Sequence, residues 1–127
     1  FNENFNLFNY EINKYDLILD RGSLTHNKIV NIESTIKNIY HGLKKKAYFF
    51  SSIFSNDHFY STKSKDQKSF SFMTKDGSGV IANFFSEKEV KKLYSNFKLI
   101  ELSKQVREIK YPVNQNFSMW NIICQKE

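Results

Sequence analysis

A short polar segment, Asp20–Ser23, follows directly on the alternating apolar run Tyr15–Leu19. The Arg21 guanidinium offers two parallel hydrogen-bond donors to one carboxylate of a ligand. Two plainer interpretations stay open, namely a surface ion pair for Arg21 and a helix cap formed by Ser23 or Asn27 at a glycine turn. A cap leaves the adjacent aspartate and arginine unexplained, so we favour a binding site held at the end of a buried strand.

His26, near the start of the next expected helix, has the chemistry of a general base. Imidazole has an unperturbed pKa of about 6.5, which suits it to accept a proton from a substrate hydroxyl or thiol near neutral pH. A partly exposed histidine at a helix start is an equally good interpretation. The sequence alone leaves both roles open.

The spacing of apolar residues along the chain predicts the strands and the helix that would position these groups. After a strand expected at 15–20, apolar residues recur at the three- and four-residue steps of one helical face. These residues are Ile29, Ile32, Ile36, Ile39 and Leu43. The helix expected over 28–43 ends near Gly42, and the aromatic and β-branched run Ala47–Phe54 predicts a strand buried on both faces. Strand, helix and strand form a βαβ unit, which predicts two adjacent parallel strands.

A polar surface excursion, Ser55–Lys68, opens the second half of the chain. The runs SFSFM and GVIANFF stand on either side of Asp76-Gly77, a turn signal that predicts a small hairpin. The stretch Gly77–Ala82, GSGVIA, also matches a dinucleotide-binding fingerprint, but a pyrophosphate needs a helix that opens at the glycines. The next helix start lies downstream at Ser86, so a loop or hairpin is the better interpretation.

The end of the chain predicts one helix and two strands. Ser86 and Glu89 form a capping box, which begins a helix expected to run to about Phe97. The runs FKLIELSKQVREIKY and NFSMWNIICQK then alternate as strands, with Pro112 and Asn114 at the connection between them. These two strands should pair antiparallel.

The composition is that of one soluble globular domain. The chain has 127 residues, of which 40% are hydrophobic and 25% are charged, which suffices for a single core. The one cysteine, Cys124, excludes an internal disulfide, and no apolar run approaches the ~18 residues of a membrane-spanning helix. We therefore expect a cytoplasmic protein without a membrane partner. The opening FNENFNLFNY has neither an initiator Met nor a secretory signal, which makes Phe1 a candidate cut point.

The net charge of +6 and the 17% aromatic content could indicate binding to nucleic acid. Lys, Asn, Ile, Phe and Tyr are over-used together, however, and an AT-rich coding sequence produces that bias in any protein. The basic run Lys44–Lys46 falls at an expected helix-to-strand turn, where cations complement the negative end of the helix dipole. A solvated helix end explains the run better than a nucleic-acid patch, and we rank nucleic acid last among the partners.

The order of these segments resembles the carboxyl-terminal half of a class I S-adenosylmethionine-dependent methyltransferase. The likeness runs over YDLILDRGSLTH, IYHGLKKKAYFFSSIF, ANFFSEKEVKKLYSNFKLIEL and MWNIICQKE, which is nearly the whole chain. An Asp-Arg-Gly segment after the fourth strand is similar to small-molecule methyltransferases of the thiopurine-methyltransferase-like or tellurite-resistance-like branch.

The resemblance implies an α/β fold, the carboxyl-terminal half of a Rossmann-like methyltransferase sheet. A parallel βαβ unit would be followed by a helix and a terminal antiparallel strand pair, with residues 1–127 as one partial domain. Sheets of this kind carry helices on both faces and bind ligands outside the carboxyl ends of their strands.

The resemblance also implies roles for the polar residues. S-adenosylmethionine is the implied cofactor, and one segment matches the lining of the methyl-donor end of its pocket. The matching residues are Asp20, Arg21, Gly22 and Ser23. His26 is the implied catalytic residue, while His58 and Tyr60 fall where the family places loops that cover the substrate. No metal is implied.

Some family features are missing from the sequence. The glycine-rich turn after the first strand and the acidic residue that holds the ribose both belong upstream of Phe1, and the usual Lys-Pro-Gly-Gly turn reads Lys44–Ala47. We therefore expect the isolated chain to bind the cofactor weakly or not at all. The expected partner is the missing amino-terminal half, or else a second copy that pairs along the Tyr15–Leu19 edge.

Two functions follow from these observations. The leading expectation is a methyltransferase fragment whose complete form transfers a methyl group to a small-molecule nucleophile. The alternative is a non-catalytic interaction module derived from the same fold. A glycine-rich strand, turn and helix encoded upstream of Phe1 would separate the two.

Overall fold

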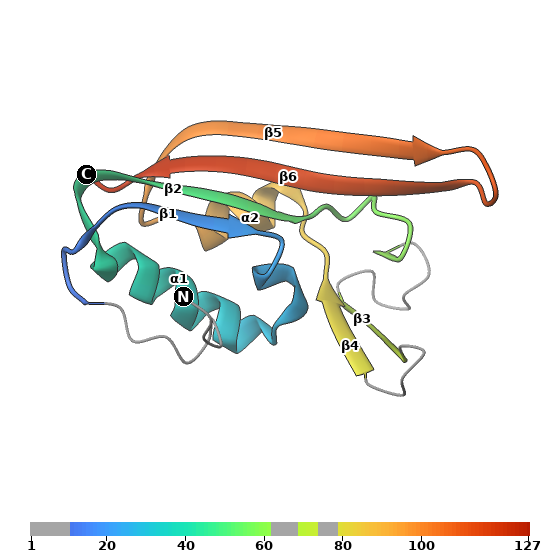
Figure 1. Ribbon diagram of the computed structural model, residues 1–127, viewed down its shortest axis with the longest axis horizontal. Helices are drawn as coiled ribbons and strands as arrows, with labels where there is room; N and C mark the ends of the chain where they lie inside the picture. Colours follow the sequence, from blue (N-terminus) through green and yellow to red (C-terminus); the bar gives the residue numbers. More distant parts are fainter. Residues whose placement is uncertain (1–10, 62–68, 74–78) are drawn as a thin grey trace.

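The computed structural model describes residues 11–61, 69–73 and 79–127 (Figure 1). Its elements alternate between strands and helices along the chain. In order they are β1 (Tyr15–Arg21), a 3₁₀ turn η1 (Leu24–His26), α1 (Ile29–Gly42), β2 (Leu43–Phe54), β3 (Ser69–Met73), β4 (Gly79–Asn83), α2 (Glu87–Leu93), β5 (Lys98–Ile109) and β6 (Gln115–Gln125).

Four strands form the main sheet, in the order β1-β2-β6-β5. β1 and β2 pair in parallel, as the predicted βαβ unit requires, and α1 makes the crossover between them. β6 pairs antiparallel with both β2 and β5. The predicted parallel pair, the crossover helix and the antiparallel terminal pair are all confirmed. β5 and β6 continue past the end of β2 as a long hairpin (Figure 1).

The hydrophobic core lies on one face of this sheet. Side chains of Ile18, Phe49 and Cys124, which are paired in register across β1, β2 and β6, form its floor. The buried residues of α1 and α2 join the same cluster, so both helices cover the same face (Figure 1). Ile32, Ile36 and Ile39 of the predicted apolar stripe lie on the buried face of α1, whereas Ile29 is 45% exposed and Leu43 is already the first residue of β2.

The opposite face of the sheet is uncovered among the described residues. Leu19 is 62% exposed and Leu17 47%, while their neighbours on β2, Phe50 and Tyr48, are 40% and 41% exposed. The expected cover of helices on both faces is therefore met on one face only. β1 is also one of the two edge strands of this sheet among the described residues. The segment FNENFNLFNY lies outside the described residues.

The boundaries of β2 and α2 correct two predictions. β2 begins at Leu43, so Lys44–Lys46 belong to the strand and do not form a turn. The strand is irregular there, because Lys46 has a φ of +69° and the register with β1 shifts between Tyr15 and Leu17. Lys44 forms an ion pair with Asp16 at 2.9 Å.

The predicted helix over 86–97 ends earlier, at Leu93. Tyr94 and Phe97 both turn into the core, where their rings lie 5.8 Å from the Phe49 ring. Packing of these two aromatic side chains competes with continuation of the helix. The capping box at its start is confirmed, since Ser86 and Glu89 exchange side-chain and backbone hydrogen bonds.

The predicted hairpin is also confirmed, because β3 and β4 pair antiparallel as a separate two-stranded sheet. Its turn, 74–78, lies outside the described residues. Gly79–Asn83 is strand, so no helix opens within the described part of the fingerprint-like stretch. The hairpin packs beside the turn η1 (Figure 1).

Candidate functional site

The turn after β1 is built around the carboxylate of Asp20. Its Oδ1 accepts hydrogen bonds from the backbone N–H of Ser23 at 3.0 Å, from that of Leu24 at 3.3 Å and from the Ser23 hydroxyl. Its Oδ2 accepts from the Ser51 hydroxyl at 2.9 Å, and Ser51 in turn contacts the Tyr94 hydroxyl at 2.7 Å. Asp20 is 5% exposed. The capping role weighed for Ser23 therefore belongs to the aspartate three residues earlier.

Two more residues at the end of β1, Gly22 and Arg21, differ in role. Gly22 has a φ of +83°, a left-handed conformation that L side chains rarely adopt, and a Cβ there would lie 3.6 Å from Met119 Cε. Arg21 is exposed and forms no ion pair with another described residue. Its guanidinium is therefore available to an anionic ligand.

Arg21 heads a polar row that crosses the uncovered face of the sheet. It pairs in register with Ser52 of β2, which pairs with Asn121 of β6. The Ser52 hydroxyl donates to Asn121 Oδ1 at 2.8 Å, and Asn121 Nδ2 donates to Gln105 Oε1 at 3.3 Å. Amide and hydroxyl groups thus adjoin the arginine, beside the apolar rows of Leu19 and Phe50.

His26 lies at the carboxyl end of the β1–β2 pair, where its contacts define its tautomer. Nδ1 lies 3.0 Å from the Ile81 carbonyl oxygen, which can only accept, so Nδ1 carries the proton. Nε2 therefore keeps its lone pair in the neutral ring. The ring meets Phe54 edge-on, with 5.4 Å between centroids. The side chain is exposed, which leaves this lone pair accessible.

Two polar residues that the sequence analysis did not select hold this turn in place. The Asn83 amide donates to the backbone oxygens of Thr25, at 3.0 Å, and of Asn27. The Thr25 hydroxyl accepts from the Phe54 backbone N–H at 2.9 Å. Both side chains are buried, and no local sequence pattern marks contacts between residues that are 29 and 58 positions apart.

His58 lies in the loop after β2 and is 1% exposed. Its Nδ1 accepts the backbone N–H of Tyr60 at 3.2 Å, and its ring contacts those of Phe54 at 4.5 Å and Tyr60 at 5.8 Å. Burial lowers the pKa of His58 below its ordinary value, although the nearby Asp57 charge raises it. The imidazole is therefore neutral near pH 7 and is packed as an aromatic ring.

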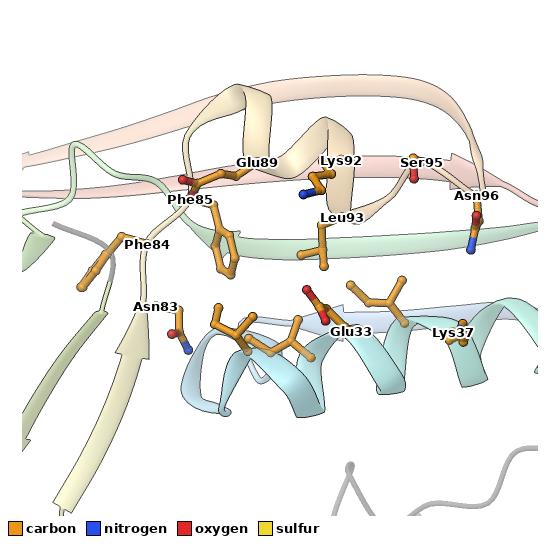
Figure 2. A pocket seen from close by; sticks show the side chains of 13 residues that line it. Glu33, Lys37, Asn83, Phe84, Phe85, Glu89, Lys92, Leu93, Ser95 and Asn96 are labelled. Carbon is orange, nitrogen blue, oxygen red and sulfur yellow. The ribbon is translucent and has the colours of Figure 1, made fainter. Parts of the chain in front are cut away.

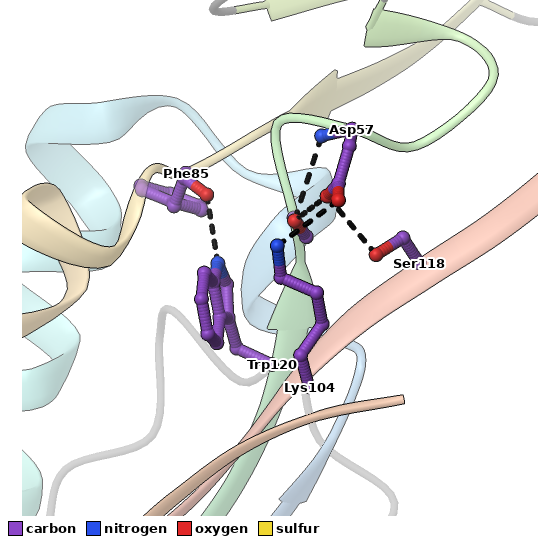
Figure 3. Close-up of polar contacts among 6 residues, drawn as sticks. Asp57, Phe85, Lys104, Ser118 and Trp120 are labelled. Carbon is purple, nitrogen blue, oxygen red and sulfur yellow. Dashed lines mark hydrogen bonds and ion pairs between the residues drawn. The ribbon is translucent and has the colours of Figure 1, made fainter. Parts of the chain in front are cut away.

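The loop that carries His58 is anchored by Asp57 (Figure 3). Its carboxylate accepts from the hydroxyls of Ser55 and of Ser118, the latter at 3.1 Å, and from Lys104 Nζ at 3.0 Å. Burial alone would raise the pKa of Asp57, but hydrogen bonds from Ser55 and Lys104 lower it to about 2. Lys104 also lies 4.6 Å above the Trp120 ring. The β5–β6 hairpin thus fixes the loop after β2.

The predicted site residues form two neighbouring groups rather than one cluster. Asp20–Ser23 and His26 belong to the turn after β1, and His58 and Tyr60 belong to the loop after β2. The Phe54 ring contacts both histidines and so joins the two groups. Within 11–61, 69–73 and 79–127, no three His, Cys, Asp or Glu side chains gather as a metal site.

A groove of about 620 Å³ lies between α1 and α2, away from these residues (Figure 2). Apolar side chains of both helices, including Ile32, Ile36 and Leu93, form its walls, and Glu33 and Lys92 face into it from opposite sides. Phe84 lines the groove and also contacts His58, with 5.5 Å between the ring centroids. None of the predicted site residues lines it.

No protein-family model and no curated protein matches the sequence. Solved structures do match. A SAM-dependent methyltransferase from Methanosarcina mazei superposes with a TM-score of 0.70 at 23% identity, over 98% of this chain and 65% of that one. The chain has a methyltransferase fold.

Two more methyltransferase structures share this fold. The 1,6-didemethyltoxoflavin-N1-methyltransferase from Burkholderia thailandensis, determined with 1,6-didemethyltoxoflavin and S-adenosylhomocysteine, has a TM-score of 0.64 at 15% identity, covering 96% of this chain and 48% of that one. A Mesorhizobium loti S-adenosylmethionine-dependent methyltransferase has a TM-score of 0.63 at 8% identity, covering 98% and 68%. The chain spans 65% and 48% of the lengths of the Methanosarcina and Burkholderia proteins.

No helix among the described residues is long and apolar enough to cross a bilayer.

Proposed function

We propose that the complete protein transfers a methyl group from S-adenosylmethionine to a small-molecule nucleophile. The observation that carries this proposal is that Arg21 ends β1, while His26 and His58, in the turns after β1 and β2, both contact the Phe54 ring at the end of β2. Ligands of open α/β sheets bind outside that end. The likeness to methyltransferase structures supports the cofactor, and the cytoplasmic location and the thiopurine-like or tellurite-resistance-like branch are proposed with it.

The Asp20–Ser23 turn fits one end of the cofactor. Arg21 is exposed, without an ion pair among the described residues, and adjoins the hydroxyl and amide groups of Ser52 and Asn121. A guanidinium in that setting suits the carboxylate of the cofactor's methionine part or of a substrate. Asp20 and Gly22 set the path of this backbone, since the carboxylate holds the turn and the glycine supplies its left-handed residue.

The cofactor, when bound, supplies a methyl group activated on a sulfonium. Displacement at that methyl depends mainly on alignment and on exclusion of water, so the protein's main task is to position the nucleophile. His26 adds a proton acceptor. With Nδ1–H donated to the Ile81 carbonyl, the exposed Nε2 lone pair can take the proton that a hydroxyl or thiol releases. His58 and Tyr60 are proposed to contact the methyl acceptor.

The remaining half of the fold is proposed as the partner. The uncovered sheet face and the β1 edge are the surfaces that such a partner would cover. The matched structures contain chain beyond the part that this one covers, which supports a further segment of the fold in preference to a second copy paired along Tyr15–Leu19. We propose that this segment is the amino-terminal half. The alternative function, a non-catalytic interaction module, uses the same surfaces without the chemistry.

Calorimetry with S-adenosylhomocysteine tests this function. The isolated chain should bind it weakly or not at all, because one wall of a pocket cannot enclose a ligand. The same chain co-expressed with its upstream coding segment should bind it. Micromolar affinity of the isolated chain would show that the site is built differently, and no affinity in the paired protein would favour the interaction module.

A further inference from the structure

β5 is an open edge of the main sheet. It pairs with β6 on one side, and no described strand pairs with its other side. Proteins prevent pairing at such an edge with short strands, prolines, bulges or charges. β5 has 12 residues and no proline, and its register shift lies near its start, between Leu99 and Glu101. Whether the regular segment 101–107 can pair with another strand therefore depends on its charges.

The side chains of this segment alternate between the two faces of the sheet. The register with β6 assigns Glu101, Ser103, Gln105 and Arg107 to the uncovered face and Leu102, Lys104 and Val106 to the core face. Glu101 and Arg107 are exposed and form no ion pair with another described residue. Val106 is 49% exposed. Two unpaired opposite charges and an uncovered apolar side chain thus lie along the open edge.

The segment is complementary to itself when it runs in the opposite direction. In an antiparallel pair of two copies centred on Lys104, Glu101 lies opposite Arg107 of the second copy, and Leu102 lies opposite Val106 of the second copy. Each of these pairs shares a face of the sheet. Directly opposite residues are close enough for opposite charges to attract and for apolar side chains to pack. Twofold symmetry repeats both contacts.

Lys104 lies at the centre of this arrangement, where two like charges would meet. Its Nζ lies 3.0 Å from Asp57 Oδ2 and 4.6 Å from the centre of the Trp120 ring (Figure 3). Both partners belong to the side of β5 that faces the rest of the sheet, away from the open edge. The carboxylate also offsets the charge of the ammonium. The lysine that could block the edge is therefore occupied within its own chain.

Neighbouring registers lack this complementarity. Moving one copy by one residue places paired side chains on opposite faces of the joined sheet. Moving it by two residues places Lys104 opposite Leu102 in one direction and opposite Val106 in the other. Among these registers, the one centred on Lys104 matches opposite charges with each other and apolar side chains with each other.

We propose that β5 is a dimerisation edge, at which the segment 101–107 pairs antiparallel with the same segment of a second copy. The contact joins two main sheets. It leaves β1, at the other edge, open to the amino-terminal half proposed above. So short a pairing is smaller than a standard protein interface, and we expect a weak dimer with a dissociation constant of roughly 10–100 µM.

Charge reversal tests the proposal in the full chain, with sedimentation velocity as the measurement. Glu101→Arg places arginine opposite arginine, and Arg107→Glu places glutamate opposite glutamate. Each change should raise the dissociation constant roughly tenfold or more. The double variant E101R/R107E restores opposite charges in both pairs and should recover the association of the unmodified chain.

A mixture of the two single variants gives the sharpest result. Each alone should be monomeric, but an equimolar mixture should form a heterodimer, because every arginine then faces a glutamate. Glu33→Arg and Lys37→Glu, exposed on α1, are the matched controls and should leave association unchanged. Thermal unfolding of all variants shows that they are folded.

Three results would overturn the proposal. The first is an unmodified chain that stays monomeric up to about ten times the expected dissociation constant. The second is association that both single reversals leave unchanged, which would assign the contact to another surface, such as the uncovered face around Leu19. The third is a mixture without heterodimers. None of them bears on methyl transfer, which cofactor binding tests separately.

Discussion

The turns after β1 and β2 are each held by an aspartate side chain, but the residue after that aspartate is exposed in the first turn and buried in the second. In each, an aspartate accepts hydrogen bonds from a serine and from a neighbouring strand, as Asp20 and Asp57 do. The residue that follows Asp20 is Arg21, which is exposed, whereas the residue that follows Asp57 is His58, which is buried. In both turns the aspartate holds the backbone, and the residue after it is the candidate functional residue.

The two aspartates also differ in their surroundings. Asp20 is buried and its partners are hydroxyls and backbone N–H groups, while the Asp57 side chain is 54% exposed and pairs with a lysine. Exposed ion pairs contribute little because water screens them. The first turn should therefore be the more costly one to disturb, and the experiments below rank the two turns on that basis.

Replacement of Asp20 should have the largest effect on stability. In Asp20→Ala, a buried anchor of four hydrogen bonds is lost and the Ser51 hydroxyl loses its acceptor, which should cost about 3 kcal/mol. Asp57→Ala should cost about 1 kcal/mol, since its site is half open to solvent. Urea unfolding of both variants measures the difference. Equal losses would show that the two turns do not differ as described.

Glycine at position 22 is required in the first turn alone. Gly22→Ala should cost about 1 kcal/mol, because the left-handed backbone at φ +83° is unfavourable for alanine although the space for its Cβ is adequate. Asn56→Ala in the second turn is the matched control and should leave stability within ~0.5 kcal/mol. Thermal unfolding of the pair checks this. A neutral Gly22→Ala would mean that the turn relaxes to another conformation.

Acid should weaken the second turn through His58. Burial lowers the pKa of His58 from 6.5, so the unfolded chain takes up a proton that the folded chain excludes. Stability is then complete above about pH 6.5 and falls as the pH drops below it, by at most ~1.4 kcal/mol per pH unit. Urea unfolding between pH 7.5 and 5 in the unmodified chain and in His58→Phe isolates this effect. Parallel curves for the two proteins would contradict it.

Arg21→Ala should have the smallest effect on stability, within ~0.5 kcal/mol, because the side chain is exposed and forms no ion pair with another described residue. In the protein paired with the amino-terminal half proposed above, the same change should weaken ligand binding or turnover by about 1.5–3 kcal/mol. Calorimetry and chemical unfolding of one preparation give both values. A large stability loss with unaltered binding would make Arg21 a structural residue.

Local patterns in the sequence sufficed to predict most of the fold. The isoleucine spacing of α1, the alternation in β1 and β6 and the capping box at Ser86 are set by neighbours in the chain, and all three are confirmed. The errors lie where distant contacts decide. α2 stops at Leu93 because Tyr94 and Phe97 pack on Phe49, a contact across about 45 residues that no local window contains.

The candidate site was predictable in part for the same reason. The run Asp20–Ser23 can be recognised in the sequence because it is polar and follows an apolar strand. The sequence could not show, however, that Asp20 and not Ser23 caps the turn. The tautomers of His26 and His58 depend on single backbone partners, Ile81 and Tyr60. Asn83 and Thr25 carry no signal at all until the β3–β4 hairpin and the turn η1 lie together.

The strand order β1-β2-β6-β5 has a consequence for synthesis on the ribosome. β2 lies between β1 and β6, and β6 is the last of these strands to be made. The β1–α1–β2 unit can assemble as it emerges, but the second edge of β2 stays open until some 60 further residues have been translated. During that interval Phe49 and Ile53 lack their neighbours in the core on β6, Cys124 and Trp120. A nascent chain of this kind needs either fast completion or a chaperone that shields that open edge.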